Sequence, residues 1–310
     1  MSSKPPFRVS VPASSANLGP GFDAIGLALD LWCRATIQSA VEFSISFKAG
    51  TYVPTNAGFE NEIVRGMDRI LGGERPRVSV QVANDIPLGK GLGASAAGAV
   101  LGIVIGAELA AVRPSERDRV RHAAEVEGHP DNALPAMLGG VVVAAMSEGM
   151  EPAYLRFEPP PGLAAVVVTP KIVLPTAAAR ALLPATYERR DVVFNLQRAA
   201  LLAASLATGD LHALRVATGD RLHQPYRAPL VPGFSEMLGF DMPGLLAIAL
   251  SGAGPSIIAL VASNAEAIGA AMSGAFAREG IDCDVFPLGI STRGATVEQL
   301  ASAATPGNRG

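Results

Sequence analysis

The strongest chemical signal in the chain lies in the segment IPLGKGLGASAAGAVLG, residues 86–102. Five glycines surround one lysine and one serine, and an apolar stretch that predicts a helix over 95–111 follows. The first N–H groups of a helix lack intrahelical partners, and the helix dipole adds about half a positive charge there. Because glycines let an anion approach these donors closely, the segment predicts phosphate binding. The same small residues are equally compatible with close packing of a helix.

The spacing within this segment excludes two common phosphate-binding motifs. A Walker-type loop ends in Gly-Lys-Ser/Thr, whereas Lys90 is followed here by Gly91. The dinucleotide-binding fingerprint needs a glycine three residues after its second glycine, and Ala96 stands at that distance from Gly93. The segment therefore belongs to neither class.

Other residues that could do chemistry are sparse. Cys33 and Cys283 are far apart and neither begins a short cysteine or histidine cluster, which argues against a disulfide framework and a structural zinc site. His122, His212 and His223 show no ligand spacing. The net charge of −3 gives no basic excess to hold a polyanion, so nucleic acid is not an expected partner.

Patterns of apolar residues outline the elements that must position the loop. In the first half of the chain they alternate in several short segments and recur at helical spacing at Ile63, Met67 and Ile70. A Pro-Ser pair predicts the start of a further helix. The expected elements are a strand running into a loop over 7–19, helices over 60–71 and 114–128, and strands over 35–47, 77–84 and 139–146.

A proline/glycine cluster, EPPPG at residues 158–162, is the predicted linker. It divides the chain into expected domains of residues 1–157 and 163–310. The second half predicts a strand over 163–170, helices over 191–208 and 210–222, and two buried strands around 251–256. The fold class expected from this layout is α+β in two halves.

The composition indicates a compact globular protein, because hydrophobic residues make up 49% of the chain and charged residues only 17%. The start of the sequence has no apolar core of signal-peptide length, and the apolar runs are too short or too interrupted to cross a bilayer. We therefore expect a cytoplasmic protein that does not contact membranes.

Two further segments narrow the function. PASSANLGPGFDAIGLALDL (residues 12–31), the glycine-rich segment and LSGAGPSIIAL (residues 250–260) together resemble, in order, the three motifs of the GHMP kinases. Within that superfamily, SANLGPGFD and EVEGHPDNALPAMLGG are most similar to homoserine kinases. The segments around two arginines, LPTAAARALLP and HQPYRAPLVPGF, also resemble homoserine kinases.

The resemblance implies a fold and an activity. The fold would be that of the GHMP kinases, with an N-terminal ATP-binding α/β domain resembling the ribosomal-protein-S5 domain-2-like fold and a C-terminal ferredoxin-like α+β domain. The activity would be ATP-dependent phosphorylation of L-homoserine in threonine biosynthesis, by a homodimer. The third motif would form a turn that supports the phosphate loop, although its small residues equally suit a tight hairpin.

The resemblance also implies contacts to ATP and Mg²⁺. Ser95 would face the metal, although Ala94 stands where many relatives carry another serine. The second metal ligand would be Glu125, with Glu127 as the competitor. Lys90 could reach a phosphate or be a solvated loop lysine. The residues implied to contact ATP are Asn61, Pro87, Leu88, Gly89, Lys90, Gly91, Leu92, Gly93, Ala94, Ser95 and Ala96.

Homoserine needs a cation for its carboxylate and an acceptor for its ammonium. Arg180 and Arg227 match the family's carboxylate-binding arginines, whose guanidinium fork suits a carboxylate. Asp23 is the expected ammonium acceptor. The full set implied to bind the amino acid is Asn17, Asp23, His129, Asp131, Asn132, Arg180 and Arg227.

Asn132 bears on the mechanism, because mevalonate-type relatives carry an aspartate there that can act as a base. An amide cannot take a proton, and phosphoryl transfer relies mainly on positioning and charge stabilisation. We expect Asn132 to orient the hydroxyl, with Asp131 as base the minority alternative. Two rival functions stay open: another GHMP kinase acting on a sugar or mevalonate-like alcohol, and a non-catalytic ATP-binding regulatory protein.

Overall fold

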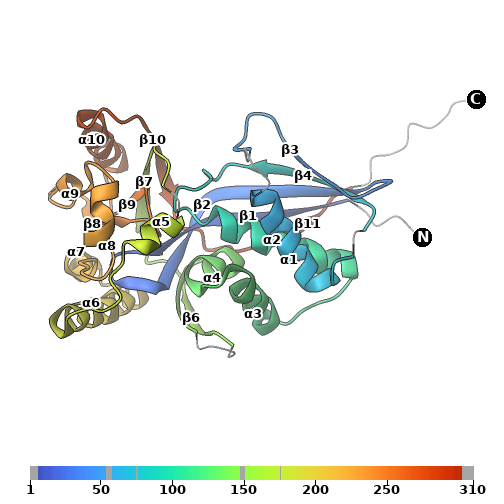
Figure 1. Cartoon of the computed structure of the whole chain (residues 1–310), viewed down its shortest axis with the longest axis horizontal. Helices are drawn as coiled ribbons and strands as arrows, with labels where there is room; N and C mark the ends of the chain where they lie inside the picture. The colour runs from blue at the N-terminus through green and yellow to red at the C-terminus, as the bar shows by residue number, and fades with distance from the viewer. Residues whose placement is uncertain (1–5, 54–57, 75, 147–150, 175, 302–310) are drawn as a thin grey trace, which may run out of the picture.

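The computed structural model describes residues 6–53, 58–74, 76–146, 151–174 and 176–301, which form two sheets with helices packed on them (Figure 1). The first sheet has seven strands in the order β11-β1-β2-β4-β3, with β5 paired to β2 and β6 to β5. Only the β3–β4 pair is parallel among the pairs described for this sheet. Its strands are β1 (Phe7–Asn17), β2 (Gly21–Ser39), β3 (Ser44–Phe47), β4 (Val78–Asn84), β5 (Val141–Ala145), β6 (Ala153–Phe157) and β11 (Thr296–Gln299).

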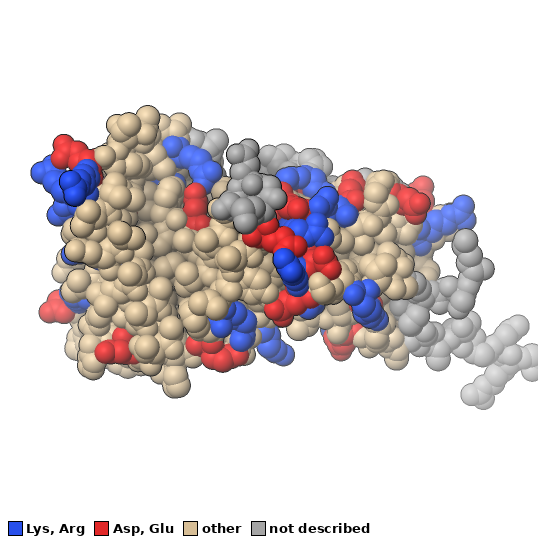
Figure 2. All heavy atoms as spheres, turned by 90° about the horizontal axis from the view of Figure 1, so that it is seen from below, with Lys and Arg blue, Asp and Glu red and all other residues tan. Residues whose placement is uncertain are grey.

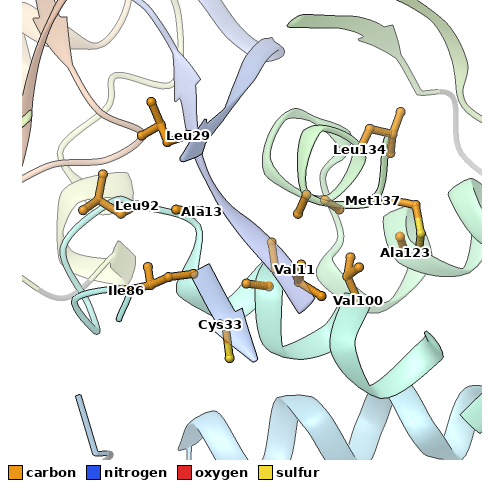
Figure 3. Close-up of a cluster of buried hydrophobic side chains, with 14 of the residues drawn as sticks. Val11, Ala13, Leu29, Cys33, Ile86, Leu92, Val100, Ala123, Leu134 and Met137 are labelled. Atoms are coloured by element: carbon orange, nitrogen blue, oxygen red, sulfur yellow. The ribbon is translucent and has the colours of Figure 1, made fainter. Parts of the chain in front are cut away.

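Four helices form the layer that carries the glycine loop: α1 (Gly58–Leu71), α2 (Ala94–Ala110), α3 (Glu116–Glu127) and α4 (Pro130–Leu138). Figure 3 shows the core beneath them, where Val11 of β1, Val100 of α2 and Met137 of α4 gather. Helix α1 packs directly against α2 at Gly102. A Cβ at this position would come within 2.0 Å of the Ile63 carbonyl oxygen, so only a glycine permits this contact. Close helix packing therefore explains the later small residues of the glycine-rich segment.

The second sheet is fully antiparallel, in the order β10-β7-β9-β8. With the strands numbered along the chain, this is the ferredoxin-like arrangement that the resemblance implies. Its strands are β7 (Ala164–Pro170), β8 (Leu245–Leu250), β9 (Ile257–Val261) and β10 (Cys283–Gly289). The helices of this half are α5 (Thr176–Ala181), α6 (Arg189–Thr208), α7 (Leu214–Ala217), α8 (Gln224–Arg227), α9 (Phe234–Met237) and α10 (Ala265–Arg278).

A long β1–β2 hairpin connects the two halves (Figure 1). Its turn enters the second half of the molecule, where the Gly252 N–H donates to the Ala16 carbonyl oxygen at 3.0 Å. A Cβ at Gly19 would lie 2.1 Å from the Thr218 carbonyl oxygen, so the backbone of the turn needs a glycine there. The hairpin therefore brings residues 17–23 against elements that lie some 200 positions later in the sequence.

Several elements differ from the sequence-based expectations. The strand expected over 35–47 is two strands, since β2 ends at Ser39 and β3 begins at Ser44. The helix expected over 210–222 is reduced to a short 3-10 turn, Leu211–Ala213, and the four-residue α7. Helix α4 was not expected, because Pro135 lies in its interior, where a proline usually breaks a helix, although Pro130 suits its first position.

The chain passes from the first sheet to the second between β6 and β7, at the segment where the linker was predicted. The chain later returns to the first sheet, where β11 pairs with β1. Residues 296–299 therefore belong to the first sheet, although the sequence placed them in the second domain. In the described part of the chain, no helix is both long and apolar enough to span a membrane.

Candidate functional site

The glycine loop, residues 89–93, leads into α2 and ends at Gly93, the residue that precedes the helix. Gly91 and Gly93 have φ values of 77° and 66°, a left-handed backbone that L side chains rarely adopt. A Cβ at Gly93 would lie 2.0 Å from Ser14 Oγ and 3.1 Å from Asn132 Oδ1. The loop is thus shaped by glycine in two ways, through its backbone conformation and through its close contact with β1 and α4.

The third sequence motif supports this loop from the second half of the molecule. Ser251 Oγ donates to the Gly91 carbonyl oxygen at 2.6 Å, and it lies 2.8 Å from Ser15 Oγ of β1. The Ser256 N–H donates to the Lys90 carbonyl oxygen at 3.2 Å. The segment is therefore both the hairpin turn between β8 and β9 and a support for the glycine loop, the two features that the sequence offered for it.

The Lys90 side chain reaches the end of β7. Its ammonium donates to the carbonyl oxygens of Pro170, at 2.9 Å, and Ile172. Burial lowers the pKa of Lys90, and the nearby Asp284 carboxylate opposes that shift. Lys90 lines a cavity of about 230 Å³ beside the loop, together with Pro87 and Leu88. The Lys90 side chain is therefore partly buried and bonded to two carbonyl groups, and its expected contact with a phosphate stays a prediction.

Ser95, in the first turn of α2, lies beside Glu127 and not Glu125. Ser95 Oγ donates to Glu127 Oε2 at 3.0 Å. Glu125 is exposed and pairs with Arg69 of α1. The two glutamates lie two positions apart at the end of α3, so they point to different sides of that helix. The structure therefore brings the competitor, Glu127, to Ser95 and directs Glu125 away from it.

The Glu127 carboxyl is half-buried, and burial raises its pKa to about 7. Its hydrogen bond from Ser95 and the Arg65 guanidinium lower the pKa, whereas the Glu62 carboxylate raises it. A cation at this position would favour the ionised carboxylate. A hydroxyl and a carboxylate oxygen side by side at a glycine loop suit a small hard cation such as Mg²⁺, which takes one or two protein oxygens.

Asn132 and Asp131 occupy the first turn of α4, and Asn132 lies against Gly93 of the glycine loop. Asn132 Oδ1 accepts a hydrogen bond from Ser14 Oγ at 3.0 Å, which fixes the orientation of its amide. Asp131 is 4% exposed, and burial followed by the Asp23 carboxylate raises its pKa to about 7. Asn132 therefore offers a fixed NH₂ group, and Asp131 a carboxyl that can be protonated near neutrality.

Opposite charges meet where the hairpin turn ends. Both Asp23 carboxylate oxygens accept from Arg180 Nη2 at 3.1 Å, and both side chains are partly exposed. Asp23 has a φ of 55°, and Asn17 Oδ1 accepts from its backbone N–H at 3.0 Å. His129 is half-buried nearby, where burial and then the Arg180 charge lower its pKa. The pair presents one cation and one anion side by side.

Arg227 lies deeper, with only 2% of its surface exposed. Its guanidinium is 5.4 Å from the Phe22 ring centroid, and it donates to the carbonyl oxygens of Ala179 and Gly252, each at 3.4 Å. Burial lowers its pKa, while the Asp23 carboxylate raises it. Arg227 is thus a buried cation behind the exposed Asp23–Arg180 pair.

Sequence reasoning missed contributions from Ser14 and His223. Ser14 carries no motif signal beyond its place in SSANLG, yet it orients Asn132. His223 was left without a role because it has no ligand spacing, yet its Nδ1 is 3.1 Å from Arg227 Nη1. Asn61 lies within α1, but its side chain falls outside the described residues, so its expected contact with ATP stays a prediction.

Comparisons with known proteins identify the family of the chain. The models of the GHMP kinases N-terminal domain and the GHMP kinases C-terminal region match residues 61–140 and 201–278. A homoserine kinase of Solibacter usitatus is 44% identical, over 81% of this chain and 84% of that protein. One of Moorella thermoacetica is 41% identical, over 93% and 99%.

A solved structure shares the fold. The crystal structure of homoserine kinase from Cytophaga hutchinsonii superimposes with a TM-score of 0.84 at 27% identity, covering 96% of this chain and 99% of that one. This likeness confirms the GHMP kinase fold and the α+β class that the sequence indicated. The chain belongs to the homoserine kinase family of the GHMP kinases.

Proposed function

We propose that the protein transfers the γ-phosphoryl group of ATP to the hydroxyl of L-homoserine, giving O-phospho-L-homoserine and ADP in threonine biosynthesis. The observation that carries this proposal is the Asp23–Arg180 pair at the end of the hairpin turn, where Asn17 donates to Gly252 of the segment that supports the glycine loop. An α-amino acid presents an ammonium and a carboxylate a few ångströms apart. These match Asp23 and an arginine, either Arg180 or the buried Arg227.

The chain's own groups suggest how the reaction is arranged. The hydroxyl oxygen of homoserine forms its bond to the γ-phosphorus while the bond to the ADP oxygen breaks. Asn132 orients the hydroxyl, and the glycine loop holds the ATP phosphates through its N–H groups. The hydroxyl proton passes to a phosphate oxygen or to water. Asp131 stays the alternative acceptor, since a carboxyl with a pKa of about 7 can take a proton at neutral pH.

We propose Ser95 and Glu127 as the protein ligands of Mg²⁺, with Glu127 in place of Glu125. Their contact at 3.0 Å supports this choice, as does the ion pair that holds Glu125 on Arg69. When bound, the metal would supply positive charge to the phosphates. The protein's part is to keep one hydroxyl and one carboxylate in place for it.

The function is tested by ADP release from ATP and Mg²⁺ in the presence of L-homoserine. We expect homoserine-dependent ADP and O-phospho-L-homoserine as the product. A panel with galactose, mevalonate and other alcohols tests the rival kinase activities, which the arginines beside Asp23 disfavour. ATP binding by folded protein without turnover of any alcohol would instead support the non-catalytic alternative and contradict our proposal.

The raised pKa of Glu127 predicts a pH-dependent Mg²⁺ requirement. Only the carboxylate form binds the metal, so as pH falls through about 7 a proton competes with Mg²⁺. The Mg²⁺ concentration for half-maximal activity should rise by up to about tenfold per pH unit below 7 and level off above 8. Glu127→Gln should lose this dependence. Protonation of ATP affects the original protein and Glu127→Gln alike. If the Mg²⁺ requirement of both proteins therefore changes with pH in the same way, Glu127 is not the metal ligand.

Cytoplasmic location and a homodimer stay predictions. Helix α6 provides a candidate face for the second copy, because it exposes the apolar side chains of Val192, Val193, Leu196 and Leu201. Figure 2 shows the molecule from below, relative to the view of Figure 1. On this side, a broad surface without charged residues covers the half that holds the second sheet and its helices.

A further inference from the structure

His223 lies between Arg227 and the turn of the β1–β2 hairpin. Its side chain is fully buried, its Nδ1 lies 3.1 Å from Arg227 Nη1, and its Nε2 lies 2.7 Å from the Gly19 carbonyl oxygen. A guanidinium only donates hydrogen bonds and a carbonyl only accepts them. Nδ1 must therefore accept from Arg227 while Nε2 carries the hydrogen that is donated to Gly19. These partners fix one neutral tautomer of the ring.

The surroundings of the ring agree with a neutral imidazole. Burial lowers the pKa of His223, and the Arg227 charge lowers it further, whereas the carboxylates of Asp220 and Asp23 oppose the shift. The Phe22 ring stacks on the imidazole, with centroids 5.1 Å apart. A proton on Nδ1 would remove the acceptor for Arg227 and place a second cation beside it.

A buried carboxylate holds the turn that carries His223. Asp220 Oδ2 accepts from the backbone N–H groups of His223 and Gln224, at 3.1 and 2.6 Å. Its Oδ1 accepts from Asn195 Nδ2 of α6 at 2.7 Å. Gln224 Oε1 then accepts from the Leu250 N–H at 2.8 Å, immediately before the turn that supports the glycine loop. The backbone that carries His223 is therefore held in place by these hydrogen bonds, which fixes the position of the imidazole.

We propose that His223 is a positioning residue for homoserine binding. Its neutral ring holds the Arg227 guanidinium and the hairpin turn at Gly19 in one arrangement, so that Arg227, Asn17 and Asp23 face the amino acid together. His223 itself does not touch the substrate. This inference rests on the proposed function, since it concerns the site for the amino-acid end of homoserine.

Two amide substitutions separate the roles of the two ring nitrogens. In His223→Asn the Oδ1 atom stands near the place of Nδ1 and can accept from Arg227. In His223→Gln the amide nitrogen stands near the place of Nε2 and can donate to Gly19, but the acceptor for Arg227 is lost. We expect His223→Gln to raise the KM for homoserine about tenfold, with the KM for ATP and the kcat within about threefold of the original. His223→Asn should recover part of that loss, because it keeps the acceptor for Arg227 but loses the donor to Gly19.

The matched control is His212→Gln, which changes an exposed histidine of the 3-10 turn and should leave all constants unchanged. In an Arg227→Lys background, His223→Gln should add clearly less than its tenfold effect, because both changes act on the same interaction. Three results would overturn the inference. The first is an equal rise in the homoserine KM in His223→Asn and His223→Gln, and the second is a double variant whose rise equals the product of the rises in Arg227→Lys and His223→Gln. The third is a change in the KM for ATP in His223→Gln.

A spectroscopic measurement separates this inference from the proposed function. The imidazole ¹⁵N spectrum of the original protein should contain a signal from a neutral histidine with its hydrogen on Nε2 that is absent from His223→Asn. The corresponding signal of His122, whose Nδ1 also accepts from an arginine, should remain in both proteins. A charged His223 ring at pH 7 contradicts the inference whether or not the protein phosphorylates homoserine. Conversely, a protein with the expected tautomer but no homoserine-dependent ADP release contradicts the proposed function alone.

Discussion

Glu127→Gln should lower kcat by about 100-fold and raise the Mg²⁺ concentration needed for activity, because loss of even an indirect partner of a metal site costs about 10- to 100-fold. The substitution preserves volume, and the amide oxygen can still accept from Ser95 Oγ, whose contact with Glu127 is 3.0 Å. The fold should therefore survive. The measurement is kcat as a function of Mg²⁺ concentration at pH 8, with the melting temperature recorded for each protein.

Glu125→Gln is the matched control, two residues away on the same helix. It removes an exposed ion pair with Arg69, and such pairs contribute about 0–1 kcal/mol to stability. Activity should stay within about twofold, since no transition-state charge is affected. If Glu125→Gln is the damaging change and Glu127→Gln is silent, α3 presents a different face to the nucleotide than it does here. If both are silent, Ser95 is the only protein ligand.

The choice between these glutamates illustrates what the sequence could predict. Local signals placed the glycine loop, α1, α3 and most strands correctly, because each depends on neighbours within a few positions. The pairing of Ser95 with Glu127 depends on where α3 ends relative to α2, which is set by packing across 32 positions. A helix expected over 114–128 includes both glutamates and does not decide between them.

The same limit explains the contributions of Ser14 and His223. Ser14 meets Asn132 across 118 positions, and His223 meets Gly19 across 204. Neither residue type nor spacing signals such contacts, because the first arises only when α4 packs against β1 and the second only when the hairpin turn enters the second half. Motif resemblance, by contrast, identified Asp23 and Arg180 as members of one site, and the structure brings the two into contact. Their roles toward the substrate stay proposals.

Arg227→Ala should raise the KM for homoserine about 10- to 100-fold while the KM for ATP stays near its original value, since an unmade charged hydrogen bond costs about 1.5–3 kcal/mol. Because Arg227 is 2% exposed and donates to two carbonyl groups, the alanine variant should also melt at a lower temperature. Arg227→Lys keeps the charge and most of the volume. It should recover only part of the loss, because an ammonium cannot reproduce the two-pronged guanidinium geometry.

Homoserine amide separates a direct contact with the carboxylate from a general loss of packing. The original protein should prefer homoserine over the amide strongly, since the amide lacks the charge that an arginine binds. If Arg227 contacts the carboxylate, its alanine variant should lose most of that preference, and the kcat/KM for the amide should change little. If instead the variant penalises both substrates equally, Arg227 acts through the packing around Gly252 and Ala179. The exposed Arg180, already paired with Asp23, then becomes the residue that binds the carboxylate, and Arg180→Ala should abolish the preference.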